Sequence, residues 1–176
     1  MKKHLKSIIV LTSICAVIAI LMALTNYITA PIIEVQEEET KKATLTEVLP
    51  GGEDITEIED FNTKYQGISS AVTGIYASSN GGYVISLKVN GYGSGMKIMV
   101  GIDETGTVVG AKCIDKGGET KGEEETYGER TIGYNIDTID VVDTVAGSTK
   151  TTAAYKKAVK IALQTVEILR NGGELR

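Results

Sequence analysis

The residue types that build metal centres and disulfide frameworks are scarce in this 176-residue chain, which has one histidine, two cysteines and no tryptophan. No Cys-x-x-Cys pair occurs, and His4 is the only imidazole. The sequence therefore predicts no intrinsic zinc, haem or iron–sulfur site. Cys15 lies inside an apolar stretch and Cys113 in a predicted strand, so a disulfide between them is not expected.

Acidic residues are missing before Glu34, and residues 7–33 contain no charged side chain. Three of the 18 lysines and arginines precede this stretch, which leaves 15 basic against 23 acidic residues after it. A surface of that sign repels nucleic acid, so no nucleic-acid partner is expected. The length and the 42% hydrophobic content suit one ordinary domain plus a short appendage, and the uneven charge excludes a simple cytosolic globule.

The charge-free stretch predicts a membrane-spanning helix. Ile8–Leu24 is almost wholly apolar, and the run extends to Ile33, enough for the roughly 20 helical residues that cross the hydrocarbon core of a bilayer. Because positive flanking charge stays in the cytoplasm, we expect a cytoplasmic N-terminus and an extracytoplasmic remainder. The flanking charges are Lys2, Lys3 and Lys6 before the stretch and Glu34, Glu37, Glu38 and Glu39 after it.

A cleaved signal peptide is the alternative interpretation of the same stretch. Its small-x-small cleavage site would have to be Ile28-Thr29-Ala30, which lacks the first small residue. Pro31 would then stand directly after the cut. A retained single-pass anchor in the cell membrane is therefore favoured.

Composition divides the chain into three parts. Residues 1–33 are predicted to form the cytoplasmic N-terminus and transmembrane helix, residues 34–66 a connecting helix and linker, and residues 67–176 an extracytoplasmic domain. Glu34–Val48 is rich in helix formers and is expected to continue the anchor helix. Pro50-Gly51-Gly52 is expected to end it.

Short β-rich runs separated by turns dominate the first half of the extracytoplasmic domain. The turns carry the glycine, asparagine and aspartate residues that tight connections demand. Along the second run, polar and apolar residues alternate in part. Such alternation gives the sheet an apolar face, which other residues of the chain must cover. The pattern predicts an antiparallel meander of four strands, Val72–Tyr76, Tyr83–Val89, Met96–Ile102 and Thr107–Ile114.

A long loop, a further strand and a helix complete the predicted domain. Lys116–Gly133 is glycine-rich, charged and aperiodic, and loops of that length are more often functional or mobile than merely connecting. Ile136–Val142 is predicted to be a strand. Thr151–Arg170 carries an apolar stripe and predicts a helix that ends at Gly172-Gly173 and covers the sheet. The predicted fold class is α+β, one N-terminal transmembrane helix followed by a small antiparallel sheet with helices on one side.

The segment from Asp143 to Thr152 is the most informative for chemistry. A glycine followed by hydroxyl residues at a helix start exposes free backbone N–H groups at the positive end of the helix dipole. Such a site binds an anion, for example a phosphate. Serine and threonine are also the ordinary residues that cap helices, so Thr149 or Thr151 acting only as a cap is the alternative.

This segment resembles the flavin-attachment motif of the FMN-binding domain family, Asp-x-x-[Ser/Thr]-Gly-Ala-Thr-x-[Ser/Thr]. Members of that family occur in the Rnf electron-transport complex and in the sodium-pumping NADH:quinone reductase, and the short chain favours the Rnf type. The chain departs from the motif at Ala146, where the family usually has serine or threonine, and at Ser148, where it usually has alanine. The matching positions are Asp143, Gly147, Thr149 and Thr151, and Thr152 continues the hydroxyl run.

Other segments extend the resemblance over most of the chain. Ala23–Ile32 is similar to the way Rnf-type members leave their membrane helix, and Gly91–Gly93 and Val100–Asp103 resemble their sheet. Glu119-Thr120 resembles the start of the family's Glu-Thr-Pro-Gly-Leu-Gly loop. Lys121-Gly122-Glu123 replaces the rest of that loop.

The resemblance implies that the Thr149 hydroxyl is esterified to the phosphate of FMN by a separate magnesium-dependent flavin transferase. It further implies an electron-transfer subunit of a Rnf-type ion-translocating ferredoxin:NAD oxidoreductase, with other subunits as partners and no catalytic residues of its own. Lys150 is a possible partner of the phosphate, and Tyr92 and Tyr127 are candidates to flank the flavin ring. The other candidate cofactor-binding residues are Ser148, Gly147, Thr151, Thr152, Asp143, Glu119 and Thr120.

Two other functions stay open at this stage. The first keeps the flavin in a stand-alone, membrane-anchored extracytoplasmic reductase. The second is an anchored, non-redox binding module in which residues 147–152 only cap a helix.

Overall fold

The computed structural model describes residues 2–172, apart from the side chains of residues 2–9, 28 and 30–40. The charges predicted to orient the anchor, from Lys2 to Lys6 and from Glu34 to Glu39, lie outside the described side chains, as do Ile28 and Ala30 of the alternative cleavage site. Contacts within the chain define two units, Met1–Lys42 and Ala43–Arg176.

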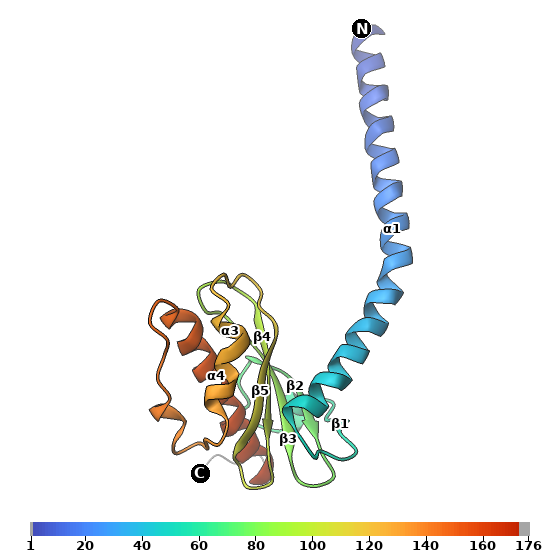
Figure 1. The fold of residues 1–176 in the computed structure, drawn as a ribbon. Coiled ribbons are helices and arrows are strands. Elements are labelled where there is room, and N and C mark those ends of the chain that lie inside the picture. The colour runs from blue at the N-terminus through green and yellow to red at the C-terminus, as the bar shows by residue number, and fades with distance from the viewer. Residues whose placement is uncertain (1, 173–176) are drawn as a thin grey trace. The chain divides into compact units, whose positions relative to one another are not determined.

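The N-terminal helix α1 runs from Lys2 to Val48 (Figure 1). Within it, Val10–Tyr27 has a mean hydropathy of 2.0, and none of its residues is buried. Among the described residues this is the one stretch that is long and apolar enough to span a bilayer. The predicted apolar helix and its continuation to Val48 are confirmed, and the helix stops just before Pro50 and Gly51.

Five antiparallel strands form one sheet in the order β1-β2-β3-β4-β5 (Figure 1). The four predicted strands are confirmed to within two residues at either end. They are β2 (Val72–Ala77), β3 (Tyr83–Val89), β4 (Met96–Ile102) and β5 (Val108–Asp115). The sequence analysis missed β1 (Thr56–Glu57), an edge strand of two residues that pairs with β2, and the short helix α2 (Phe61–Lys64) after it.

The strand predicted over Ile136–Val142 is wrong. The Asn135 side chain accepts hydrogen bonds from the N–H groups of Asp137 and Thr138 at 3.1 Å, and this turn bends the chain. A 3₁₀-helix, η2 (Ile139–Val141), follows. Ile139 and Val142, three residues apart, both face the core, which is a helical spacing rather than the two-residue alternation of a strand.

The predicted loop Lys116–Gly133 also contains helical structure, namely α3 (Glu123–Thr126) and the 3₁₀-helix η1 (Tyr127–Thr131). Three consecutive glutamates, Glu123–Glu125, make this segment look solvent-exposed in the sequence, although some of its residues face the core. Tyr127 and Thr131 are 1% and 0% exposed, and the side chain of Glu124 is also buried. The second half of this segment is therefore packed against β5 rather than solvated.

The last helix, α4 (Thr149–Arg170), packs on β3 and β4 as predicted (Figure 1). It begins two residues earlier than expected and is followed by Gly172 with a positive φ of 71°. Its buried face meets one face of the sheet in the main core. The fully buried members of that core include Ile75, Ile85, Leu87, Ile98, Val100, Tyr155, Ala158, Val159 and Ala162.

The opposite face of the sheet is also covered, which corrects the prediction of helices on one side. Leu45, Val48 and Leu49, at and just after the end of α1, form a second buried cluster with Tyr76, Val84 and Met99 of the sheet. The partial alternation in β3 follows from this arrangement. Val84 and Ile85 point to opposite faces, and both are fully buried.

Two glycines of the sheet allow the end of α1 to pack closely against this face. Gly101 and Gly110 are opposite each other on β4 and β5. A Cβ atom would lie 1.9 Å from the Val48 carbonyl oxygen at Gly101 and 2.4 Å from it at Gly110. The backbone of α1 therefore contacts the sheet at a distance that only glycine permits.

We expect Gly110→Ala to destabilise the folded domain by about 1–3 kcal/mol, because the added methyl group overlaps a backbone carbonyl that no side-chain rotation can move. Urea unfolding of the full chain in detergent, followed by near-ultraviolet circular dichroism, measures the loss. Lys112→Ala is the control, because it removes only the exposed ion pair with Glu47. If Gly110→Ala and the wild type have the same free energy of unfolding, the end of α1 does not pack against these glycines.

Candidate functional site

A cleft of about 340 Å³ lies at the start of α4. Three segments far apart in the sequence line it, namely the turn between β3 and β4, the loop after β5, and the chain that enters α4. Its volume falls at the small end of the range typical of ligand pockets. The lining residues are Tyr92, Thr120, Lys121, Gly147, Ser148, Thr149, Lys150 and Thr151.

The predicted motif enters α4 through a tight turn. The N–H of Ser148 donates to the carbonyl of Val145 at 3.1 Å, with Gly147 in the third position at φ +87°. A turn of this kind requires a positive φ there, which explains the glycine. Ala146, one of the two departures from the family motif, is exposed and does not line the cleft.

The four hydroxyl residues at the start of α4 have different surroundings. Thr152 is 0% exposed, and its oxygen accepts the N–H of Val145 at 3.1 Å while donating to the carbonyl of Ser148 at 3.0 Å. Thr151 is 1% exposed and donates to Glu119. Ser148 is buried, and its Oγ has no hydrogen-bond partner. Thr149 alone is exposed, held only by a long 3.4 Å contact with the Val145 carbonyl.

Glu119 joins the three segments from behind the cleft wall. Its Oε1 accepts the N–H of Gly93 at 2.9 Å, and its Oε2 accepts the hydroxyl of Thr151 at 2.5 Å. The side chain is 5% exposed. Both carboxylate oxygens are therefore engaged inside the protein, and Thr120 and Lys121, the next two residues, lie on the cleft wall.

Glycines allow this close approach. A Cβ atom at Gly91 would lie 2.5 Å from Glu119 Oε1, and one at Gly93 would lie 2.1 Å from the carbonyl carbon of Gly118. The turn after β3 and the loop after β5 thus meet backbone to backbone. Sequence reasoning singled out Gly91 and Gly93 by family resemblance, but it did not connect them with Glu119.

The electrostatics of the cleft favour an anion. Two of the lining residues, Lys121 and Lys150, are basic, and no acidic residue lines it among the part of the chain that the structure describes. The first turn of α4 also lacks acidic residues. A helix start without carboxylates presents unpaired N–H groups and a partial positive charge to whatever lies in front of it.

The two candidates to flank a flavin ring, Tyr92 and Tyr127, lie in different environments. Tyr92 is 69% exposed and lines the cleft. The prediction for Tyr127 is wrong, because its ring is 1% exposed and packs edge-on against Tyr155, with the ring centroids 5.5 Å apart. Burial raises the pKa of Tyr127, and its hydroxyl donates to the carbonyl oxygen of Asp143 at 3.0 Å. Tyr127 therefore supports the motif from the core.

Asp143 and Cys113 lie away from the cleft. The Asp143 residue is exposed, and its backbone rather than its carboxylate is held in place, by Tyr127. Both cysteines are free, as expected. Burial raises the pKa of the Cys113 thiol to about 11, so the thiolate form that reacts as a nucleophile is scarce at neutral pH.

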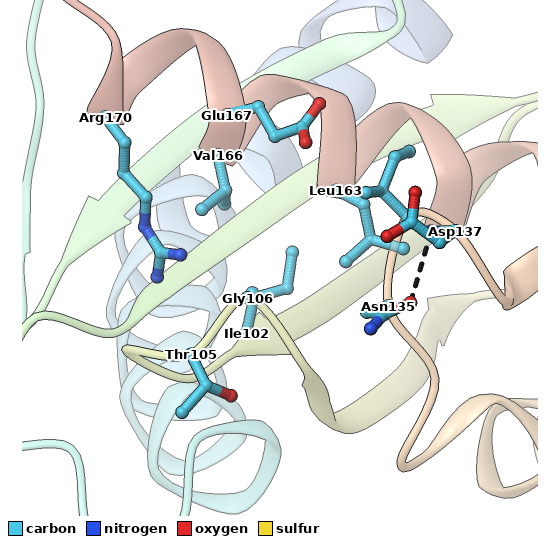
Figure 2. A pocket seen from close by; sticks show the side chains of 10 residues that line it. Ile102, Thr105, Gly106, Asn135, Asp137, Leu163, Val166, Glu167 and Arg170 are labelled. Atoms are coloured by element: carbon cyan, nitrogen blue, oxygen red, sulfur yellow. Dashed lines mark hydrogen bonds between the residues drawn. The ribbon is translucent and has the colours of Figure 1, made fainter.

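A second cavity, of about 230 Å³, lies near the other end of α4 (Figure 2). Two of its polar side chains already make hydrogen bonds, since Arg170 donates to the Asp103 carbonyl at 2.7 Å and Asn135 accepts the N–H of Asp137. Asp137 and Glu167 add two carboxylates to its lining, as Figure 2 shows. The cleft at the start of α4 is therefore the better candidate for an anionic cofactor.

Comparison with known protein families agrees with this geometry. Residues 91–164 match the model of the FMN-binding domain, and this span contains every residue that lines the cleft. Residues 1–48 match the RnfG N-terminal region. The chain is therefore similar to FMN-binding domains over the span that holds the cleft and to RnfG over its N-terminal helix. A search of the curated proteins found no match.

The apolar helix and the RnfG match together indicate a single-pass membrane protein. The matched N-terminal region, residues 1–48, ends at the last residue of α1. The apolar span Val10–Tyr27 lies inside it. Membrane attachment is therefore part of the region that relates this chain to RnfG.

We expect Glu119→Ala to destabilise the domain by about 2–3 kcal/mol, because it leaves the Gly93 N–H and the Thr151 hydroxyl without their acceptor. Thr151→Val removes only one of these bonds and should cost less. Urea unfolding in detergent measures both changes, with Glu125→Ala, an exposed glutamate of α3, as the matched control. A loss no larger than that of Glu125→Ala would mean that Glu119 does not hold the cleft together.

Proposed function

We propose that this chain is the flavoprotein subunit of a Rnf-type ion-translocating ferredoxin:NAD oxidoreductase, with FMN attached to Thr149 by a phosphoester bond. In this role it passes electrons between partner subunits and is not catalytic alone. The observation that carries the proposal is the division among the four hydroxyl residues at the start of α4, of which Thr149 alone is exposed.

A hydroxyl that receives a cofactor from another protein must be reachable and must not be committed elsewhere. Thr151 and Thr152 fail both conditions, because they are buried and donate to Glu119 and to the Ser148 carbonyl. Ser148 fails the first, at 4% exposed. Thr149 meets both, since it is exposed, lines the cleft, and its hydroxyl makes only a long 3.4 Å contact with the Val145 carbonyl.

The surroundings of Thr149 suit a phosphate. The phosphodiester formed on its oxygen keeps a negative charge, which the N-terminus of α4 and the ammonium groups of Lys121 and Lys150 stabilise. Gly147 leaves the approach open, because nothing lies within 4 Å of where its Cβ would be. The residues present therefore fit the phosphate end of FMN.

Attachment requires a separate flavin transferase and a flavin diphosphate donor. The Thr149 oxygen forms a bond to the phosphorus on the flavin side, and the bond from that phosphorus to the bridging oxygen breaks. The other phosphate leaves with the rest of the donor, and the hydroxyl proton passes to solvent. No oxidation or reduction occurs in this step.

FMN, when bound, supplies one-electron chemistry, while the chain supplies position and surroundings. Tyr92 presents an exposed ring at the cleft, where it can pack on a planar group. Thr120 and Lys121 form the facing wall, which Glu119 fixes. Glu119 itself supports this wall rather than lining the cleft.

The domain is proposed to face the extracytoplasmic side, with residues 1–33 as anchor, 34–66 as connection and 67–176 as the FMN-binding domain. A cofactor held without a covalent bond is retained only while its free concentration stays comparable with its dissociation constant. Outside the cell no pool of FMN maintains that concentration. A covalent link retains the cofactor whatever the free concentration of FMN.

A cysteine introduced at exposed Glu104 in a Cys15→Ser, Cys113→Ser background tests this orientation. We expect a membrane-impermeant thiol reagent to label it in intact cells or spheroplasts, because the domain lies outside the membrane. A cysteine introduced at Ser7, before the apolar span Val10–Tyr27, is the matched control and should be labelled only after lysis. The reverse pattern would place the domain in the cytoplasm.

The attachment site is tested by coexpressing the full chain with an active flavin transferase and measuring intact mass and in-gel ultraviolet fluorescence after denaturation. We expect the wild type to gain one FMN less one water and to stay fluorescent. Thr149→Val should show neither the added mass nor the fluorescence, because it keeps the shape of threonine without the hydroxyl.

Thr152→Val is the matched control, since it also removes a motif hydroxyl but one that is buried and bonded. Thr152→Val should still gain the flavin if it folds. Near-ultraviolet circular dichroism shows whether it has folded. A wild-type chain without an adduct, with the transferase shown to be active on another substrate protein, would contradict the proposal. The non-redox binding module would then be the better account.

A further inference from the structure

The hydroxyl of Ser148 is the buried polar group of the motif that has no hydrogen-bond partner within the folded chain. Its Oγ is buried, the residue is 4% exposed, and no hydrogen-bond partner is present. Burial of a hydroxyl without a partner is unfavourable, and folded proteins leave few such groups. A partner from outside the chain would remove this cost.

Helix capping does not use this hydroxyl. Ser148 is the N-cap residue of α4, a position where a serine oxygen ordinarily accepts a backbone N–H of the first turn. Its φ and ψ are −126° and 28°, and it makes no such side-chain bond. Ser148 is one of the residues that line the cleft, and its unpaired Oγ is buried beneath the cleft surface.

The groups around Ser148 define the kind of partner. The cleft is lined by two lysines and by the N-terminal turn of α4, and it has no acidic lining residue among those described. A serine hydroxyl can donate one hydrogen bond, and it lies next to these positively charged groups. The partner is therefore an anion with acceptor oxygens of small radius, as a phosphate has.

We infer that Ser148 Oγ donates a hydrogen bond to a non-bridging oxygen of a phosphate group held at the N-terminus of α4. The inference rests on the proposed function in that the phosphate is the one esterified to the adjacent Thr149. Free phosphate has the same chemistry and fits the same donors. Ser148 forms no covalent bond, and its role is to position the phosphate.

The experiment titrates the unloaded full chain in detergent with inorganic phosphate at constant ionic strength, following the amide signals of residues 147–151 by NMR. We expect Ser148→Ala to weaken phosphate binding roughly tenfold, the effect of losing one hydrogen bond to a charged group. Ser94→Ala is the matched control, an exposed serine in the turn between β3 and β4 that does not line the cleft.

A second measurement separates this role from a structural one. Ser148→Ala removes a buried, unpaired hydroxyl, so the melting temperature of the unloaded chain should stay the same or rise. The same substitution should reduce the rise in melting temperature that phosphate produces in the wild type. A lower melting temperature in the absence of phosphate would mean that Ser148 supports the fold, and this would overturn the inference.

A third measurement uses the flavin-loaded chain and phosphorus NMR. The phosphorus NMR signal of the phosphodiester should move in Ser148→Ala and not in Ser94→Ala, with the flavin mass unchanged in both. Equal phosphate affinity in Ser148→Ala and the wild type, or no phosphate binding by the wild type, would overturn the inference. If phosphate binds through Ser148 while the wild type gains no flavin, the phosphate site stands and the proposed attachment fails.

Discussion

The two hydrogen bonds accepted by the Glu119 carboxylate hold together the three segments from which the cleft is built. One oxygen accepts the Gly93 N–H of the turn between β3 and β4, and the other accepts the Thr151 hydroxyl in the first turn of α4. Because both oxygens are engaged, a buried carboxylate lies beside the cleft proposed to bind an anion without lining it. Removing either donor would leave part of a buried charge without compensation.

The motif at the start of α4 is organised around this contact. Thr151 faces inward to Glu119, and Thr152 closes the turn that precedes the helix. Ser148, at the N-cap, lines the cleft while its hydroxyl is buried and unpaired. Thr149 is the residue that this arrangement leaves outside. The fold thus distinguishes one hydroxyl from three near neighbours by burial and hydrogen bonding, which the sequence of similar side chains does not display.

Local signals in the sequence predicted much of the fold. Glycine and Asx turns located β2 to β5, and the apolar stripe located α4 to within two residues. Contacts over a long sequence separation escaped prediction. Glu119 lies 26 residues from Gly93 and 32 from Thr151, and no periodic pattern links them. The covering of the second sheet face by Leu45, Val48 and Leu49 was missed for the same reason.

The errors also have local causes. Ile136–Val142 has the composition of a strand, but the Asn135 turn and the three-residue spacing of its buried side chains make it helical. Tyr127 lies in a charged and glycine-rich segment that was predicted to be a loop, and it is instead part of the core. The candidate site residues come from the family motif, and the structure shows that their hydroxyls differ in burial and hydrogen bonding.

Fragmentation mass spectrometry of the flavin-bearing peptide from the wild-type chain tests the central claim most directly, because it reads the attachment position without any substitution. The peptide that contains residues 147–152 should carry a single FMN, and every fragment that retains the flavin should include Thr149. Flavin on Ser148, Thr151 or Thr152 of the folded wild-type protein would contradict the account, since it would show that burial and hydrogen bonding do not select the acceptor.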